Sequence, residues 1–407
     1  MKRILLSVLL AGAMTLPVWA AELTHWEHQY EARTAVLKSL VQSYEQNSPD
    51  KIAFEPIPYD SYFDKLTTAL STGTGPDIFK VPATMAYQLI KAGLVAPAPA
   101  DVMSAATAHA DYLSWAVDPA IQDGKLYGLP TDVQTVVMYI NDELLKSCGG
   151  DPANPPKTWD EFAALSKACA KREDGKLVQA GVDTRYKWAV YTTLMYQATD
   201  GRIVDAEDRK AIYDSPEGMK AWAFMHDLFT GPDAVDQPTF MTGQFKFELG
   251  KALFYLNHPT TRSRLASMSP GLKYTIAMPP SPDGKGKTVA SSWLYMVNAA
   301  AKDPEAAWKW IAYITNENAQ KLWVEQGSDL PALNKSVDNP TFFTDANAKV
   351  VEQSLKNVYV PQEIGGNPID DIRQAIWDEM VINSADPAAI VPRQIAKENE
   401  LIAETLR

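Results

Sequence analysis

The sequence predicts an α/β fold that is divided between two compact units. Short runs of β-branched and aromatic residues alternate with longer stretches of helical periodicity, which is typical of layered α/β proteins and not of bundles or β-sandwiches. The chain has 407 residues, of which 46% are hydrophobic, and this length exceeds what one hydrophobic core usually supports. The composition is that of an ordinary globular protein, so two α/β units are expected.

The first twenty residues have the pattern of a secretory signal peptide. Lys2 and Arg3 form a basic start, residues 4–13 are apolar but too few to span a bilayer, and residues 18–20 match a small-residue cleavage site. The mature chain is then expected to begin at Ala21 and to be soluble in the periplasm of a Gram-negative cell, not embedded in a membrane. An uncleaved N-terminal anchor is the alternative interpretation.

The net charge limits the possible partners. Removal of the signal peptide takes two positive charges from a formal charge of −12, which becomes −14. Nucleic acids and anionic membranes are bound by concentrated Lys and Arg, so neither is expected as a partner.

Two cysteines, Cys148 and Cys169, are present in the whole sequence. In an oxidising compartment a disulfide between them is expected. Closing so short a loop contributes about 3 kcal/mol to stability in the chain-entropy model. Their spacing is not that of a CxxC motif, so redox catalysis is not expected.

Strand character recurs along the chain in short runs rich in β-branched and aromatic residues. The predicted strands are residues 23–26, 52–57, 77–81, 133–139, 253–256, 274–277 and 293–297.

Helices are predicted between most of these strands, and several helix starts are marked. Thr158 and Glu161 form a capping box, while Ser215 and Asp303 each precede a proline at the first helical position. Trp308 lies on a helical repeat of apolar residues after Asp303, which predicts a core position for it and not a ligand contact.

A series of short sequence motifs resembles the motifs of a known protein family. The strings are GTGPDI (73–78), GLV (93–95), DGKLYGLP (123–130), YIN (139–141), PKTWDEF (156–162), GKA (250–252) and GSDLP (327–331). In this order and at these separations they resemble the family 1 extracellular solute-binding proteins of ABC importers, the group that includes maltose-binding protein. The resemblance extends over nearly the whole mature chain.

The resemblance implies a fold of two α/β lobes, the type II periplasmic-binding-protein fold. The ligand cleft is expected between the lobes, and several crossing segments are expected to form the hinge. Residues 21–129 with 258–300 are expected in the N-terminal lobe, and residues 130–257 with 301–407 in the C-terminal lobe.

Ligand-binding residues are expected where strands end. Open α/β sheets bind ligands beyond the carboxyl ends of their strands. This rule selects Trp26, Glu27 and His28 after the first predicted strand, and Asn257 and His258 after residues 253–256. The resemblance adds a further set: Lys80, Asp132, Gln134, Tyr186, Trp188, Trp293, Asn367, Asp370 and Arg373.

The chemistry of these side chains suits a sugar. Aromatic rings stack on the C–H faces of sugars, while carboxylates, amides and guanidinium groups pair with hydroxyls. Trp26 and Trp293 have a core-packing interpretation as well, and Glu27 can cap a turn or meet solvent. His25 and His28 lack the i,i+4 helical spacing of a zinc pair, so no metal is expected.

The function implied by the resemblance is that of a periplasmic receptor. It captures a mono- or oligosaccharide and delivers it to an ABC permease in the inner membrane, acting as a monomer without a cofactor. Glycerol-phosphate, acidic oligosaccharides and polyamines stay open as ligands. The motifs GxSxG and HExxH and the P-loop are missing, so an enzyme is not expected. The competing enzyme hypothesis is a periplasmic glycoside hydrolase that uses Glu27 and Asp132.

Overall fold

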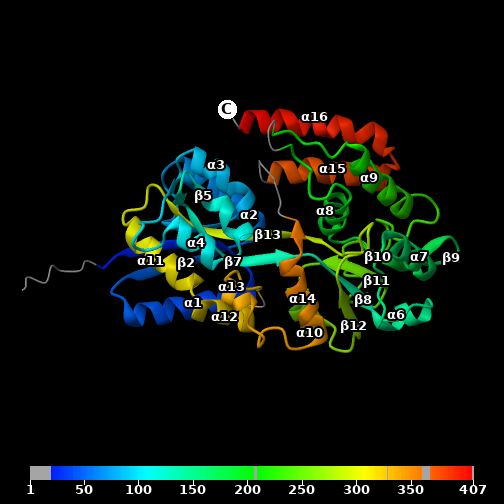
Figure 1. The fold of residues 1–407 in the computed structure, drawn as a ribbon, viewed down its shortest axis with the longest axis horizontal. Coiled ribbons are helices and arrows are strands. Elements are labelled where there is room, and N and C mark those ends of the chain that lie inside the picture. The colour runs from blue at the N-terminus through cyan, green and yellow to red at the C-terminus, as the bar shows by residue number, and fades with distance from the viewer. Residues whose placement is uncertain (1–19, 206–208, 328, 360–366, 406–407) are drawn as a thin grey trace, which may run out of the picture.

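The computed structural model describes residues 20–205, 209–327, 329–359 and 367–405. Two lobes lie side by side, and each is built around one mixed β-sheet (Figure 1). The two-lobed α/β fold expected from the sequence is therefore confirmed. The predicted signal peptide, except Ala20, lies outside the described residues.

The first lobe is organised around a sheet with the strand order β14-β13-β3-β1-β2, in which β4 and β7 also pair with β13. Its strands are β1 (Glu22–His28), β2 (Lys51–Ile57), β3 (Ile78–Pro82), β4 (Val95–Ala96), β7 (Gly128–Thr135), β13 (Thr288–Asn298) and β14 (Val358–Tyr359). A small separate pair is formed by β5 (Ile121–Gln122) and β6 (Lys125–Leu126). The helices before β7 are α1 (Glu31–Asn47), α2 (Tyr59–Ser71), η1 (Ala83–Met85), α3 (Ala86–Lys91), α4 (Ala105–Asp111), α5 (Ser114–Val117) and η2 (Asp118–Ala120).

The second lobe has a sheet with the order β12-β8-β11-β10-β9. Its strands are β8 (Val137–Asn141), β9 (Lys171–Glu173), β10 (Lys176–Asp183), β11 (Ala252–Asn257) and β12 (Tyr274–Ala277). Its helices are α6 (Asp142–Ser147), α7 (Trp159–Cys169), α8 (Lys187–Ala198), α9 (Pro216–Phe229), α10 (Thr261–Met268), α14 (Ala346–Lys356), α15 (Asn367–Asn383) and α16 (Pro387–Thr405). Among the described helices, none combines the length and the apolar content needed to cross a bilayer.

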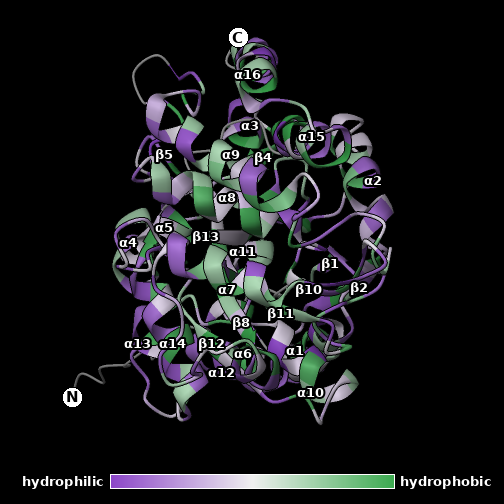
Figure 2. Ribbon diagram, turned by 90° about the vertical axis from the view of Figure 1, so that its right-hand side faces the viewer, coloured by the Kyte–Doolittle hydropathy of each residue, from purple (hydrophilic) through white to green (hydrophobic). Residues whose placement is uncertain are grey.

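The predicted strands are present except at residues 133–139, which were expected as one strand but divide at Val136 between β7 of the first sheet and β8 of the second. The helix starts follow the predicted caps. Thr158 and Glu161 form both hydrogen bonds of a capping box at the start of α7. Ser215 and Asp303 accept hydrogen bonds from backbone N–H groups of the first turns of their helices, each with proline at the first positions. Hydrophobic residues line the strands and the inner faces of the helices (Figure 2). The capping residues and the hydrophobic pattern of the sequence therefore agree with the observed helices and strands.

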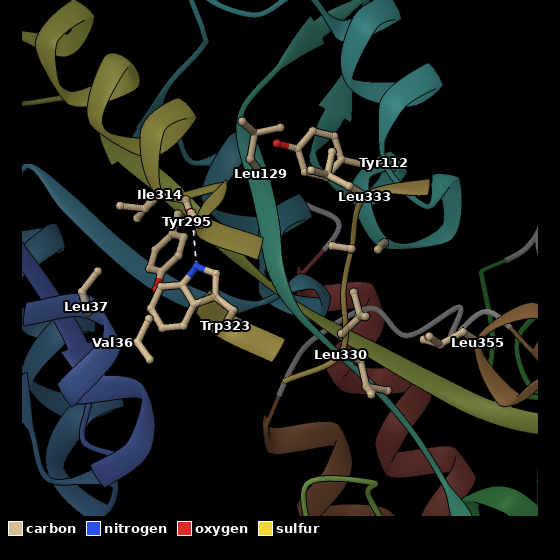
Figure 3. Close-up of a cluster of buried hydrophobic side chains, with 14 of the residues drawn as sticks. Val36, Leu37, Tyr112, Leu129, Tyr295, Ile314, Trp323, Leu330, Leu333 and Leu355 are labelled. Carbon is tan, nitrogen blue, oxygen red and sulfur yellow. Dashed lines mark hydrogen bonds between the residues drawn. The ribbon is translucent and has the colours of Figure 1, made fainter. Parts of the chain in front are cut away.

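Helices α11 (Pro304–Thr315) and α12 (Glu317–Gly327), followed by the short α13 (Asn334–Val337), pack on the first lobe. They contact α1, β7 and β13, and Trp308 is fully buried as predicted. Figure 3 shows Trp323 of α12 beside Val36 and Leu37 of α1, with its indole N–H donating to the Ile314 carbonyl at 2.8 Å. These helices supply much of the core on one face of the first sheet.

The expected division into lobes is wrong in two segments. Residues 301–407 were expected in the second lobe, but α11 and α12 belong to the first, because the short link after β13 folds them back onto its sheet. Residues 258–300 were expected in the first lobe, but β12 pairs with β8 in the second sheet. The chain therefore passes between the lobes at other places than expected.

The predicted disulfide is present. Cys148 at the end of α6 is bonded to Cys169, the last residue of α7, with their Cα atoms 5.4 Å apart. It ties together two neighbouring helices on the outside of the second sheet.

Candidate functional site

A cavity of about 850 Å³ lies between the two lobes. The first lobe contributes residues that follow β1 and β3 together with α2, α3 and α5, and the second lobe contributes residues that follow β10 and β11 together with α15. The site thus lies beyond the carboxyl ends of strands, as predicted. Its wall is formed by His28, Tyr30, Arg33, Tyr59, Pro82, Ala83, Thr84, Tyr87, Trp115, Asp118, Pro119, Ile121, Gln122, Asp132, Gln134, Tyr186, Trp188, Val204, Asp205, Arg209, His258, Thr260, Ser291, Ser292, Trp293, Asp329 and Asp370.

The floor of the cavity is formed by β7 and β13, which are paired antiparallel. Asp132 lies opposite Trp293, and Gln134 lies opposite Ser291. Directly opposite residues of an antiparallel pair point to the same face, so these four side chains are presented together. Asp132 and Gln134 are also two residues apart on one strand, and the Gln134 Nε2–H donates to Asp132 Oδ1 at 2.7 Å.

A buried cluster of charged side chains adjoins the floor: Glu27, Arg33, Lys80, Asp132 and Asp329. Arg33, Asp132 and Asp329 line the cavity, whereas Glu27 and Lys80 lie behind it. Lys80 Nζ is 3.1 Å from both Glu27 Oε1 and Asp132 Oδ2. Arg33 Nε donates to Glu27 Oε1 at 2.9 Å, and Arg33 also forms an ion pair with Asp329. The cluster joins α1, β1, β3, β7 and the segment after α12.

The two cations keep Glu27 and Asp132 ionised. Burial alone would raise the pKa of each carboxyl, but Lys80 and Arg33 outweigh it and hold both pKa values well below their usual range. Burial lowers the pKa of Lys80 and Arg33 adds to this, whereas Glu27 and Asp132 oppose the change. Two cations thus face three carboxylates in a nearly dry environment.

Two aromatic groups face the cavity from opposite lobes. From the first lobe, the ring centroid of His28 lies 4.5 Å from that of Trp293 and 5.5 Å from that of Tyr59. From the second lobe, the ring centroid of Tyr186 lies 5.7 Å from that of Trp188 and 5.3 Å from that of His258. A flat ligand between the lobes would therefore meet aromatic surface on both sides.

Both cavity histidines are neutral. Burial lowers the pKa of His28 to about 3, with Lys80 adding to the effect. Burial also lowers the pKa of His258. The His258 Nδ1–H donates to the Thr135 carbonyl at 2.9 Å, so its Nε2 accepts from the Tyr186 hydroxyl at 2.9 Å. In the described part of the chain, no group of three or more His, Cys, Asp or Glu is arranged to hold a metal ion.

Many of the residues predicted from the sequence lie on the cavity wall. They are His28, Asp132, Gln134, Tyr186, Trp188, His258, Trp293 and Asp370. Whether each contacts a ligand stays a prediction.

Trp26, Glu27 and Lys80, which were also expected to bind the ligand, do not line the cavity. Trp26 precedes the end of β1 by two residues and packs on the α2 side of the sheet, with Lys65 Nζ 4.2 Å from its ring centroid. Glu27 and Lys80 lie behind the floor, because their charges are neutralised in the buried cluster. They support the floor without forming part of it.

Asn257 and Arg373 also lie off the wall. The Asn257 side chain is used in the turn after β11, where it accepts from the His258 N–H and donates to the Tyr255 hydroxyl. Arg373 is buried between α15 and α16 and donates to Glu398 at 2.6 Å. The side chain of Asn367, the first residue of α15, falls outside the described residues.

Several wall residues were missed by the sequence analysis, among them Arg33, Tyr59, Tyr87, Trp115 and Asp329. Arg33 could have been noticed in the sequence, because it lies in the first turn of α1. A positive side chain is unfavourable there next to the helix dipole, so its presence suggests another role. Tyr59 is 53% exposed at the start of α2, directly after a strand, so the strand-end rule applied there too. Trp115 and Tyr87 lie in short helices that carry no clear sequence pattern.

The sequence and the fold of this chain are similar to those of known proteins. The family model described as bacterial extracellular solute-binding protein matches residues 29–321. A binding protein of Brucella abortus is 23% identical over 97% of this chain and 97% of its own length. The galactooligosaccharide-binding protein of Bacillus subtilis is 23% identical over 90% of this chain and 86% of its own. The sugar-binding protein MalE of Xanthomonas citri has the same fold, with a TM-score of 0.79 and 20% identity over 94% of this chain and 98% of that one.

Proposed function

Because this chain belongs to the family of bacterial extracellular solute-binding proteins, we propose that it is the periplasmic binding component of an ABC importer. In this role the protein captures a mono- or oligosaccharide in the cavity between its lobes and delivers it, as a monomer, to a membrane permease. The sequence pattern of residues 1–20 supports export. N-terminal sequencing of protein recovered from the periplasmic fraction should begin at Ala21, and recovery of the full-length chain in the cytoplasm would contradict export.

The observation that carries the sugar assignment is the combination of aromatic walls with a polar floor. Trp293 and His28 face Trp188 and Tyr186 across the cavity, and Gln134 lies on the floor between them. Sugars offer apolar C–H faces above and below a rim of hydroxyls, which matches this arrangement. The galactooligosaccharide-binding relative supports the same ligand class.

The size of the cavity favours more than one sugar ring. Pockets for small molecules span about 300–1,000 Å³, and the 850 Å³ here is near the upper end of that range. We infer that a di- or trisaccharide fills the cavity better than a monosaccharide does.

Binding couples to lobe closure. Contacts to Trp293 on one side and Trp188 on the other can be made at once only when the lobes are together, so a ligand that uses both stabilises the closed form. The closed form then presents both lobes to the permease in one fixed arrangement. No covalent step is required for this role.

The glycoside hydrolase hypothesis is not supported by the charges at Glu27 and Asp132. Glycoside hydrolysis needs one carboxyl that keeps its proton at neutral pH and so donates it to the leaving group. Lys80 contacts both carboxylates, and the pKa of each lies well below its usual range. Glu27 is also behind the cavity floor, out of reach of a ligand.

Calorimetric titration of protein refolded free of co-purified ligand tests the assignment. The panel contains galactobiose, mannobiose, maltotriose, trigalacturonate, glycerol-phosphate and spermidine. A neutral sugar should bind and raise the thermal midpoint, since a ligand that binds only the native state stabilises it by about 2.7 kcal/mol at a hundred times Kd. Binding confined to glycerol-phosphate, trigalacturonate or spermidine, or binding of none, would contradict the sugar assignment.

Substitution of a wall tryptophan locates the site. Trp188→Ala should weaken binding of the sugar by on the order of 2 kcal/mol, because a central aromatic contact is lost. Trp26→Ala is the matched control, since Trp26 packs on the far side of the sheet and should leave the affinity unchanged. Equal effects of the two substitutions would contradict the placement of the site.

A further inference from the structure

The two lobes meet at the edge of the cavity through a pair of side chains. The guanidinium carbon of Arg209, in the second lobe, lies 5.3 Å from the ring centroid of Tyr87, in α3 of the first lobe. Both residues line the cavity. A guanidinium group within about 6 Å of an aromatic centroid is attracted to the face of the ring. The lobes are therefore joined at this point by an attraction between protein side chains alone.

Arg209 lies in a segment that is fixed to the second lobe. Ala211, two residues further on, forms an antiparallel bridge with Val204. The Ala211 N–H also donates to Asn399 Oδ1 of α16 at 2.7 Å. Val204 and Ala211 are both buried in the core of the second lobe. A change in the angle between the lobes therefore carries Arg209 with the second lobe.

The backbone of Arg209 has an unusual conformation. Its φ angle is 51°, in the left-handed region that residues other than glycine seldom adopt. Such conformations persist where the surrounding structure imposes them, and they are common at functional positions. The anchored segment supplies that constraint. The placement of Arg209 beside the cavity therefore calls for a functional explanation.

The other cations near this contact do not bridge the lobes. Lys91 belongs to the same helix as Tyr87, and its Nζ lies 5.7 Å from the centroid of the same ring. Arg33, the second guanidinium on the cavity wall, is held in an ion pair with Asp329 within the first lobe. Among the described residues of the wall, Arg209 is thus the cation that connects one lobe with the other.

We propose that Tyr87 and Arg209 form a clasp that stabilises the closed arrangement of the lobes, and that it does so independently of the bound solute. The clasp is a contact within the protein, so this inference goes beyond the proposed function and does not require the solute to be a sugar. Helix α3 and the second-lobe helices α15 and α16 lie on the same side of the floor strands β7 and β13 (Figure 1). A rotation that parts the lobes on this side separates Tyr87 from Arg209 and breaks the clasp.

The clasp affects how solute affinity is set. The apparent Kd of a solute that binds the closed form equals its intrinsic Kd divided by the fraction of closed protein. A clasp that raises this fraction tightens the binding of every such solute by the same factor. A side chain that contacts the solute instead changes the affinities of different solutes by different factors, because each solute presents different groups to it.

Single-molecule energy transfer on protein refolded free of co-purified ligand tests the clasp. Dyes are attached through Thr67→Cys on α2 and Ala396→Cys on α16, which are exposed positions on opposite lobes. The native cysteines are bonded to each other and do not take up dye. The measured quantity is the ratio of closed to open molecules.

Arg209→Gln and Tyr87→Leu should each lower the closed-to-open ratio by about 2- to 5-fold, the range of an exposed cation–π contact. The double variant should lower it no further, because both changes remove the same contact. Arg202→Gln is the matched control, since Arg202 is exposed in the same segment but does not line the cavity, and its ratio should equal that of wild type. Equal closed fractions in wild type and both clasp variants, zero included, would overturn the clasp, and so would single effects that add in the double variant.

Titration of the same proteins with galactobiose, mannobiose and maltotriose separates the clasp from a ligand contact. In Arg209→Gln the Kd of each sugar that binds should rise by one common factor, no larger than the fall in the closed-to-open ratio. Factors that differ between sugars, with an unchanged closed fraction, would make Arg209 a ligand contact and overturn the clasp. If none of the sugars binds, the energy-transfer result still decides the clasp, and only the sugar assignment fails.

Discussion

Replacement of Lys80 by methionine tests whether the buried charge cluster holds the first lobe together. Lys80 is 0% exposed, and its Nζ lies 3.1 Å from both Glu27 Oε1 and Asp132 Oδ2. Methionine keeps an apolar stem of similar length but leaves both carboxylates facing Arg33 alone. Removing one partner of a buried ion pair costs about 3–5 kcal/mol. Because Arg33 remains 2.9 Å from Glu27 and 3.8 Å from Asp132, we expect a loss of about 3 kcal/mol in unfolding free energy.

The loss should depend on pH in a defined direction. The pKa values of Glu27 and Asp132 in the folded protein are lowered, so the stability they contribute is present above about pH 5 and is lost as the pH falls. Without Lys80 these pKa values rise, and protonation relieves the repulsion between the carboxylates. The difference between wild type and variant should therefore be larger near pH 7.5 than near about pH 4.5.

Urea unfolding at both pH values measures this difference, with Lys65→Met as the control. Lys65 is 41% exposed and pairs with Glu55 at 2.6 Å on the outside of the same lobe, where a surface ion pair contributes at most about 1 kcal/mol. If Lys80→Met proves as stable as Lys65→Met, or if its deficit is the same at both pH values, the electrostatic account of the cluster is refuted.

Other properties of the protein can be checked in the same way. Sugar affinity should stay constant between about pH 5 and 8, because the pKa of His28 is about 3 and this side chain stays neutral over that range; a calorimetric titration with a step near about pH 6 would contradict this. Reduction of the Cys148–Cys169 disulfide should lower the unfolding free energy by about 3 kcal/mol in urea, and equal stability with and without reductant would be the opposing result. Gly181→Ala should destabilise the second lobe by about 1–3 kcal/mol or more, because the new Cβ would lie 2.1 Å from a backbone carbonyl oxygen of α7. Gly271→Ala, where no described atom lies within 4 Å, should differ little from wild type in the same unfolding assay.

The strands that were predicted from the sequence are those with a dense β-branched or aromatic pattern. Residues 253–256 and 274–277 match β11 and β12 closely. The strand β10 was missed because Gln179 and Gly181 interrupt its apolar run, although Gly181 is needed there for the close approach of α7. Local pattern cannot reveal such a requirement, since it comes from a neighbour distant in sequence.

The assignment of elements to lobes was harder to predict than the elements themselves. The helical pattern around Trp308 was read correctly, but the lobe on which it packs depends on contacts with α1 and β7. These contacts are long-range, and no periodicity within residues 301–327 encodes them. The predicted boundaries were therefore wrong although the helices were right.

Where the strand-end rule applied directly, as at His28 and His258, the selected residues line the cavity. Lys80 and Arg373 lie off the cavity wall, because a charged residue near a strand or helix end can be used inside the protein as well as toward a ligand. The difference lies in the presence of buried partners such as Glu27 and Glu398, and a single sequence does not pair them.

The position of β13 has a consequence for how the protein is made. This strand separates β3 from β7 and pairs with both, yet it is synthesised after all five strands of the second sheet. Until β13 emerges from the ribosome, β3 and β7 each have an unpaired edge, and the sheet of the first lobe lacks a central strand. Pairing between such distant segments is slow because a large loop must close first. The nascent chain should therefore remain open and translocation-competent for longer than one whose N-terminal sheet is contiguous in sequence.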